Sequence, residues 1–141
     1  MTPLYTAEAT CNAKGRGGGH AETSTGNIKV DLVPPKEMGG PGGEGTNPEQ
    51  LVALGYSACF AGALGLVASQ RNADVKDARI TCRATIGKDD AGFGLAFEID
   101  VVIPGMPQDQ AQQLVDAAHE VCPYSKAFRH GAPALAKAQA G

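Results

Sequence analysis

Residues 46–62 read TNPEQLVALGYSACFAG, and the organisation of the chain follows from this stretch. Thr46 and Glu49 have the spacing of a capping box, in which each side chain satisfies a free amide at the start of a helix. Pro48 fixes a helical φ angle where a missing N–H costs nothing. No charged residue occurs between positions 51 and 69. We therefore expect a helix that is buried on nearly all sides.

Cys59 lies in the middle of this apolar segment, directly after a Gly-Tyr-Ser sequence. Gly55 interrupts the helical pattern and Ser57 has the chemistry of an N-cap, so the helix either restarts here or continues as one piece. A restart would place Cys59 in a first helical turn, where free N–H groups stabilise a thiolate. Most free cysteines are instead inert and buried. The residues alone leave both possibilities open.

The composition indicates a folded protein of ordinary character. With 141 residues and 43% hydrophobic content, residues 1–141 are expected to form a single domain with its own core. A formal charge of -3 and the lack of a basic cluster argue against nucleic acid as a partner. The N-terminus lacks the basic and apolar regions of a signal peptide, and the apolar helix has no second span beside it. We therefore expect a cytoplasmic protein with no membrane partner.

The predicted elements fall into two groups of strands, each followed by a helix. Their order predicts an α+β fold with antiparallel sheet rather than a parallel α/β fold. The segment 130–141 is rich in alanine, and no element is assigned to it. The expected strands cover 4–11, 20–25, 27–33, 75–86 and 94–103, and a Gly-rich loop covers 38–45. An amphipathic helix is expected over 107–121, and its apolar stripe consists of Ala111, Leu114, Val115, Ala118, Val121 and Cys122.

The four cysteines are far apart in sequence and include no C-x₂-C pair, which argues against a zinc site or a disulfide scaffold. Cys122 ends the amphipathic helix on its core-facing side, and it is the natural partner for Cys59, because a sulfenic acid needs a second thiol to resolve it. Cys11 and Cys82 fall in expected strands and are interpreted as bystanders. His119 and Cys122, with another cysteine, leave a metal-binding module as a weak alternative.

Ten positions separate Glu49 from Cys59, which is about 15 Å along a straight helix. The two residues share a site only if the helix breaks near Gly55 or a long side chain bridges them. Arg16, among the glycines of the loop at 12–19, is such a side chain, since its planar fork can hold a carboxylate and a thiolate together. Taken singly, Arg16 is more simply a solvated charge and Glu49 a capping carboxylate.

Three segments resemble the organic hydroperoxide resistance (Ohr) proteins of the wider OsmC superfamily: NPEQLVALGYSACFAGAL at 47–64, EVCPYS at 120–125 and the Gly-Arg-Gly loop at 15–17. The resemblance extends through most of the chain. It implies an α+β homodimer of intertwined chains, with antiparallel sheets wrapped around central helices. It also implies a thiol peroxidase that reduces organic and fatty-acid hydroperoxides to alcohols.

Matched by motif, the resemblance makes Cys59 the peroxidatic cysteine and Cys122 the resolving cysteine. Arg16 matches the active-site arginine, and Glu49 matches the carboxylate that orients it. The family binds no cofactor, and its external reductant is a lipoyl-type dithiol carried by a lipoylated protein.

The apolar helix and the loop at 38–45 are expected to favour apolar peroxides, with Met38 and Phe60 as candidate substrate contacts. A non-catalytic thiol redox sensor is the main alternative, and it would form the disulfide without turning over. The chain departs from its relatives after Ser125, where alanine and proline stand in place of a β-branched strand.

Overall fold

The computed structural model describes all 141 residues, and the backbone divides into two compact units, Met1–Val52 and Ala53–Gly141. The expectation that residues 1–141 form one domain stays a prediction.

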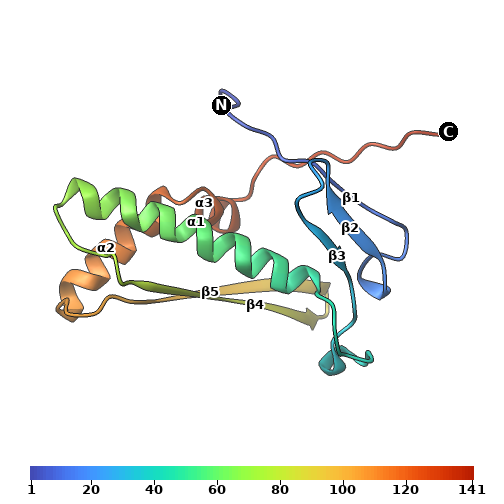
Figure 1. Ribbon diagram of the computed structural model, residues 1–141, viewed down its shortest axis with the longest axis horizontal. Helices are drawn as coiled ribbons and strands as arrows, with labels where there is room; N and C mark the ends of the chain where they lie inside the picture. Colours follow the sequence, from blue (N-terminus) through green and yellow to red (C-terminus); the bar gives the residue numbers. More distant parts are fainter. The chain divides into compact units, whose positions relative to one another are not determined.

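The N-terminal unit contains a three-stranded antiparallel sheet in the order β1-β2-β3 (Figure 1). Its strands are β1 (Ala9–Cys11), β2 (His20–Thr23) and β3 (Lys29–Asp31). The expected antiparallel meander is confirmed, but the prediction that the first strand covers 4–11 is wrong. Thr23, the last residue of β2, pairs with Ala9, so residues before Ala9 have no neighbouring strand on this side.

Two short 3₁₀ helices and a Gly-rich loop complete this unit. They are η1 (Gly15–Gly17), which carries Arg16, and η2 (Lys36–Met38), which precedes the loop. The loop needs glycine for close approach, because a Cβ on Gly40 would lie 2.3 Å from the Pro34 carbonyl oxygen. It leads into helix α1 (Pro48–Gln70).

The start of α1 differs from the predicted capping box. The Asn47 side-chain oxygen accepts the Gln50 amide at 2.8 Å, so Asn47 caps the helix. The Thr46 hydroxyl instead donates to the Gln50 side chain at 2.8 Å. This shift of one residue leaves the Glu49 carboxylate free for another partner.

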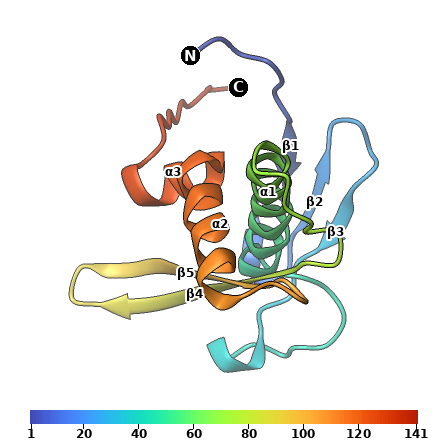
Figure 2. The ribbon, with the colours of Figure 1, turned by 90° about the vertical axis from the view of Figure 1, so that its left-hand side faces the viewer.

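The C-terminal unit packs helices against one long hairpin. Strands β4 (Arg79–Asp89) and β5 (Gly92–Val102) pair in antiparallel register along their whole length. Figures 1 and 2 show α1 and α2 (Gln108–Val121) side by side on the same face of this hairpin, whose tip extends beyond both helices. Strand β5 and helix α2 agree with the predicted ranges 94–103 and 107–121 to within two residues, whereas β4 begins four residues and ends three residues later than the predicted strand 75–86. The chain has an α+β fold.

Helix α1 is continuous, so a restart at Gly55 is excluded. Its buried positions share one face: Tyr56, Phe60, Ala63, Leu64, Val67 and Ala68. Leu54 and Leu66 on other faces are 67% and 54% exposed, so the prediction of burial on nearly all sides is wrong for a single chain. By length and composition α1 would pass as a membrane span, as the core helices of soluble proteins also do. Its packed face belongs to the core.

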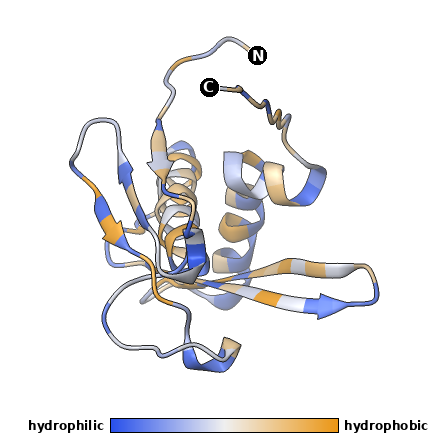
Figure 3. Ribbon diagram, turned by 90° about the vertical axis from the view of Figure 1, so that its right-hand side faces the viewer, coloured by the Kyte–Doolittle hydropathy of each residue, from blue (hydrophilic) through white to orange (hydrophobic).

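Helix α2 is amphipathic as predicted, and Figure 3 shows apolar and hydrophilic residues alternating around it. Leu114, Ala118 and Cys122 are buried, but Val121 is 40% exposed, contrary to the predicted stripe. The two adjacent positions, Val121 and Cys122, cannot both face the core at the end of a helix. An additional helix, α3 (Pro123–His130), begins directly afterwards with Pro123 in its first turn. Residues 131–141 form neither helix nor strand.

Candidate functional site

Arg16 and Glu49 form a bidentate ion pair in the N-terminal unit. Nη1 donates to Oε2 at 3.0 Å and Nη2 donates to Oε1 at 2.8 Å. The hydrogen bond and the charge of the partner lower the pKa of Glu49 and raise that of Arg16, so both groups stay ionised. A guanidinium has five N–H donors, and two of them engage the carboxylate. The others can serve a second anion.

The backbone around Arg16 explains how this side chain reaches α1. Gly18 closes the 3₁₀ turn with a left-handed φ of 118°, and its amide bonds the Gly15 carbonyl. Glu49 lies in the first turn of α1, where the helix dipole also favours a negative charge. The sequence hypothesis that these residues make an ion pair is confirmed by this geometry.

Cys59 and Cys122 lie together in the C-terminal unit, with 3.5 Å between their sulfur atoms. Both are free thiols. A disulfide requires a sulfur–sulfur distance of about 2.05 Å, so the two atoms need to approach by only about 1.5 Å. Cys122 is fully buried and Cys59 is partly exposed. Cys11, which is exposed, and Cys82, which is half-buried, lie in strands β1 and β4, as the sequence predicts.

Neighbouring groups shift the pKa of the Cys59 thiol in opposite directions. Burial raises the pKa of the Cys59 thiol, and the neighbouring Cys122 raises it further, whereas a hydrogen bond from the Tyr124 amide lowers it. The net direction is upward. Cys59 lies near the middle of the continuous helix α1 and not in its first turn, so the start of its own helix does not stabilise a thiolate. The first turn of α3 supplies an amide donor instead, and Pro123 was the sequence signal for that helix start.

A buried chain of hydrogen bonds lies beside the two thiols. The Tyr56 hydroxyl and the Ser125 hydroxyl are 2.8 Å apart, and His119 Nδ1 lies 2.9 Å from the same Ser125 oxygen. Ser125 is completely buried. No group of three or more His, Cys, Asp or Glu side chains is arranged to hold a metal ion. A metal module built on His119 and Cys122 thus has no set of ligands in this chain.

Aromatic side chains fill the space between α1, β5 and α3. Tyr56 is stacked on Tyr124, and Phe97 is stacked on Phe128 with ring centroids 4.0 Å apart. A cavity of about 340 Å³ opens beside them between β5 and α2, with Tyr56, Phe60, Phe97, Val115 and His119 in its lining. Phe60 therefore borders a cavity although its side chain belongs to the core. Met38, the other predicted contact, is partly exposed at the end of η2 in the N-terminal unit.

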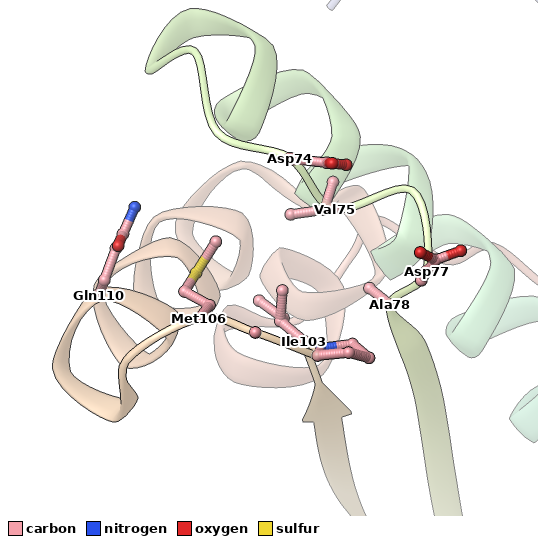
Figure 4. A pocket seen from close by; sticks show the side chains of 9 residues that line it. Asp74, Val75, Asp77, Ala78, Ile103, Met106 and Gln110 are labelled. Carbon is pink, nitrogen blue, oxygen red and sulfur yellow. The ribbon is translucent and has the colours of Figure 1, made fainter.

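A second cavity, of about 280 Å³, lies where β5 runs into α2 (Figure 4). The carboxylates of Asp74 and Asp77 stand at its rim, and Ile103 and Met106 form part of its apolar wall. No cysteine lines this cavity. The Cys59–Cys122 pair therefore lies outside this cavity.

Comparison with known proteins shows the family to which this chain belongs. The sequence profile of the OsmC-like protein family matches residues 40–135. The organic hydroperoxide resistance protein of Xanthomonas axonopodis pv. citri is 46% identical over 127 residues, which is 89% of this chain and 88% of that protein. The organic hydroperoxide resistance protein OhrB of Bacillus subtilis is 43% identical over 128 residues, with 89% and 91% covered.

A solved structure shows the same fold. The crystal structure of an organic hydroperoxide resistance protein from Legionella pneumophila superposes with a TM-score of 0.83 at 43% identity, covering 92% of this chain and 93% of that one. Because identity and fold agree over nearly the whole length, the resemblance noted in the sequence is confirmed. This chain belongs to the OsmC-like family and, within it, to the organic hydroperoxide resistance proteins.

Proposed function

We propose that this protein is a cysteine-based thiol peroxidase that reduces organic hydroperoxides to alcohols. The observation that carries the proposal is the pair of free thiols, one partly exposed and one buried, with sulfur atoms 3.5 Å apart. The names of the relatives support the substrate class, since they are organic hydroperoxide resistance proteins.

The reaction is a two-step oxidation of the thiol pair. The Cys59 thiolate attacks the distal oxygen of the hydroperoxide, the O–O bond breaks, and the alkoxide takes a proton to leave as the alcohol. Cys59 becomes a sulfenic acid. The Cys122 sulfur then attacks the Cys59 sulfur, which forms the disulfide and releases water. An external dithiol of lipoyl type, carried by a lipoylated protein, reduces the disulfide by thiol–disulfide exchange.

Arg16 supplies the positive charge that this mechanism needs. Burial and the neighbouring thiol raise the pKa of Cys59, so a cation is required to make a thiolate near neutral pH. The Arg16 guanidinium, held by the Glu49 carboxylate, takes this role and stabilises the alkoxide as the O–O bond breaks. The N–H groups of Arg16 that do not bind Glu49 can donate hydrogen bonds to the Cys59 thiolate and to the alkoxide.

The cavity that Phe60 borders is lined by apolar side chains such as Phe97 and Val115 and by the charged Glu98 and Asp116. Its apolar part favours alkyl chains over hydrogen peroxide, and Met38 is the second proposed substrate contact. We also propose a cytoplasmic homodimer. Leu54 and Leu66 on α1 are 67% and 54% exposed on a single chain, and a partner subunit would cover large apolar side chains of this kind. Light scattering should give a mass of two chains, and a single-chain mass would contradict the dimer.

The function is tested by the consumption of cumene hydroperoxide with dihydrolipoamide as the reductant. Wild type should turn over many times, and Cys59→Ser should show none. Cys122→Ser should consume one equivalent, form a sulfenic acid that dimedone traps, and then stall. Cys11→Ser and Cys82→Ser serve as matched controls that keep both thiols of the pair.

Two results would overturn the proposal. Full turnover by Cys59→Ser would remove the assigned nucleophile. A wild type that forms the disulfide once and accepts no electrons from any dithiol would be a redox sensor and not a peroxidase.

A further inference from the structure

Ser125 joins the three helices of the C-terminal unit at one buried point. Its hydroxyl oxygen lies 2.8 Å from the Tyr56 hydroxyl of α1 and 2.9 Å from His119 Nδ1 of α2, and Ser125 itself belongs to α3. Ser125 has no exposed surface and Tyr56 is 3% exposed. We call these three residues the Tyr56–Ser125–His119 clamp.

The clamp lies one helical turn from each of the two thiols. Cys59 follows Tyr56 by three positions on α1. Cys122 follows His119 by three positions at the end of α2 and precedes Ser125 by three positions at the start of α3. Residues three apart share a helix face, so the clamp and the thiol pair lie on the same side of all three helices.

The first turn of α3 depends on this clamp for its position. The helix has eight residues, which is too short to be stable by itself. Tyr124, directly before Ser125, donates its amide to the Cys59 sulfur, and Cys122 begins the same turn. Every buried side-chain oxygen and nitrogen here has a partner, so loss of one clamp member would leave a buried polar group unpaired.

We propose that the Tyr56–Ser125–His119 clamp positions Cys122 and the first turn of α3 against Cys59, and that it thereby sets how readily the Cys59–Cys122 disulfide forms. The hydrogen bonds of the three side chains join them to one another and not to either sulfur, so we assign them as positioning residues. A clamp that holds two sulfur atoms near contact raises the effective concentration of one thiol at the other. This inference rests on the proposed function, in which that disulfide is the second step, and deepens it.

The disulfide equilibrium can be measured without any peroxide. Oxidised glutathione takes two electrons from the pair, so that two protein S–H bonds give one S–S bond and two molecules of glutathione are released. The measurement uses the full chain with Cys11→Ser and Cys82→Ser, which leaves only the pair. Mixtures of glutathione and oxidised glutathione give the equilibrium constant, and alkylation of free thiols reports the fraction reduced.

Tyr56→Phe keeps the ring and its packing and removes only the hydroxyl. Ser125→Ala removes the central oxygen. We expect each to lower the equilibrium constant for disulfide formation about tenfold, which raises the reduction potential by about 30 mV. His119→Leu should have the same effect, whereas His119→Asn, whose side-chain oxygen can occupy the place of Nδ1, should stay near wild type. Ser57→Ala is the matched control, because its hydroxyl bonds only the Leu54 carbonyl of the same helix.

Wild-type potentials in Tyr56→Phe and His119→Leu would overturn the clamp, whatever the activity. If Ser125→Ala fails to fold, as judged by thermal unfolding, these two variants decide the question. A clamp-dependent potential in a protein that consumes no hydroperoxide would instead overturn the proposed function and leave the clamp standing. A wild type that forms no disulfide in oxidised glutathione would overturn both.

Discussion

Replacement of Arg16 by alanine tests whether this side chain ionises the partly exposed Cys59 thiol. The bidentate pair with Glu49 shows that Arg16 is held in a fixed orientation. Burial and Cys122 shift the pKa of Cys59 in the unfavourable direction, and the Tyr124 amide only partly offsets them. If Arg16 supplies the missing stabilisation, the variant should lose thiolate at neutral pH and recover it in alkali.

The size of the effect follows from the ionised fraction. An ordinary thiol with a pKa of about 8.5 is roughly 3% thiolate at pH 7, and a raised pKa lowers this fraction further. Full ionisation by Arg16 is therefore worth at least about 30-fold in thiolate concentration. A thiolate of higher pKa is intrinsically more nucleophilic, by about threefold for each unit of pKa, and this offsets much of that factor. Arg16→Ala should thus react about threefold to fivefold more slowly at pH 7, before any loss of alkoxide stabilisation is counted.

The assay is single-turnover oxidation of Cys59 by cumene hydroperoxide from pH 6 to pH 10, with the thiolate followed by its ultraviolet absorbance. The difference between wild type and variant should narrow as the pH rises, and any gap that remains at pH 10 measures transition-state stabilisation. Arg83→Ala is the control, because Arg83 is likewise an arginine held by carboxylates, here Glu98 and Asp100, but it lies on the exposed hairpin. Equal Cys59 pKa values and rates in Arg16→Ala and wild type would refute the reasoning.

Three further substitutions test other parts of the structure. Glu49→Gln removes the carboxylate that orients Arg16, so peroxidase activity should fall about tenfold, and unchanged activity would contradict the orienting role. The free energy of unfolding in urea should change by less than about 1 kcal/mol, because Arg16 is partly exposed. Gly55→Ala places a Cβ 3.1 Å from the Tyr124 hydroxyl oxygen, and the partly exposed Tyr124 side chain can move away from it. The gain in helix propensity of about 1 kcal/mol should therefore leave the free energy of unfolding equal or higher, and a loss above about 1 kcal/mol would show that the Tyr124 ring cannot move. Two carboxylates, of Asp31 and Glu22, raise the pKa of His20, so the stability that its charge contributes is fully present below pH of about 6.5 and is lost as the pH rises through the raised pKa. In His20→Gln the urea midpoint of unfolding should therefore decline less with rising pH than in wild type, and an equal decline would contradict this contribution.

Local patterns in the sequence were sufficient to predict most of the fold. Alternation in 94–103 and the apolar stripe of 107–121 correspond to β5 and α2, because one face of each element packs against the core. The helix cap was wrong by one residue because Thr46 and Asn47 are both good caps, and only the Asn47–Gln50 bond distinguishes them. Helix α3 was missed because eight residues carry too little periodicity.

The sequence predicted the two residue pairs of the candidate site, Arg16–Glu49 and Cys59–Cys122, but not the residues that hold them in place. Cys122 followed from the stripe of α2, and Arg16 followed from the planar fork of its side chain, which can hold a carboxylate and a thiolate together. The bond between Tyr56 and Ser125 spans 69 positions, and no local pattern encodes a contact of that range. Gly55 was interpreted as a break. In the folded chain α1 continues through it, and the missing side chain leaves room for the Tyr124 ring.

The different burial of the two thiols supports the proposed order of their oxidation, Cys59 before Cys122. Cys122 is fully buried, so a peroxide in solution reaches the partly exposed Cys59 first. A sulfenic acid formed there is already near the second sulfur, at a starting separation of 3.5 Å. Cys122 should therefore not replace Cys59 as the nucleophile. In Cys59→Ser, dimedone should trap no sulfenic acid at Cys122 within the time in which wild type is fully oxidised, and trapping at the wild-type rate would show that burial does not protect it.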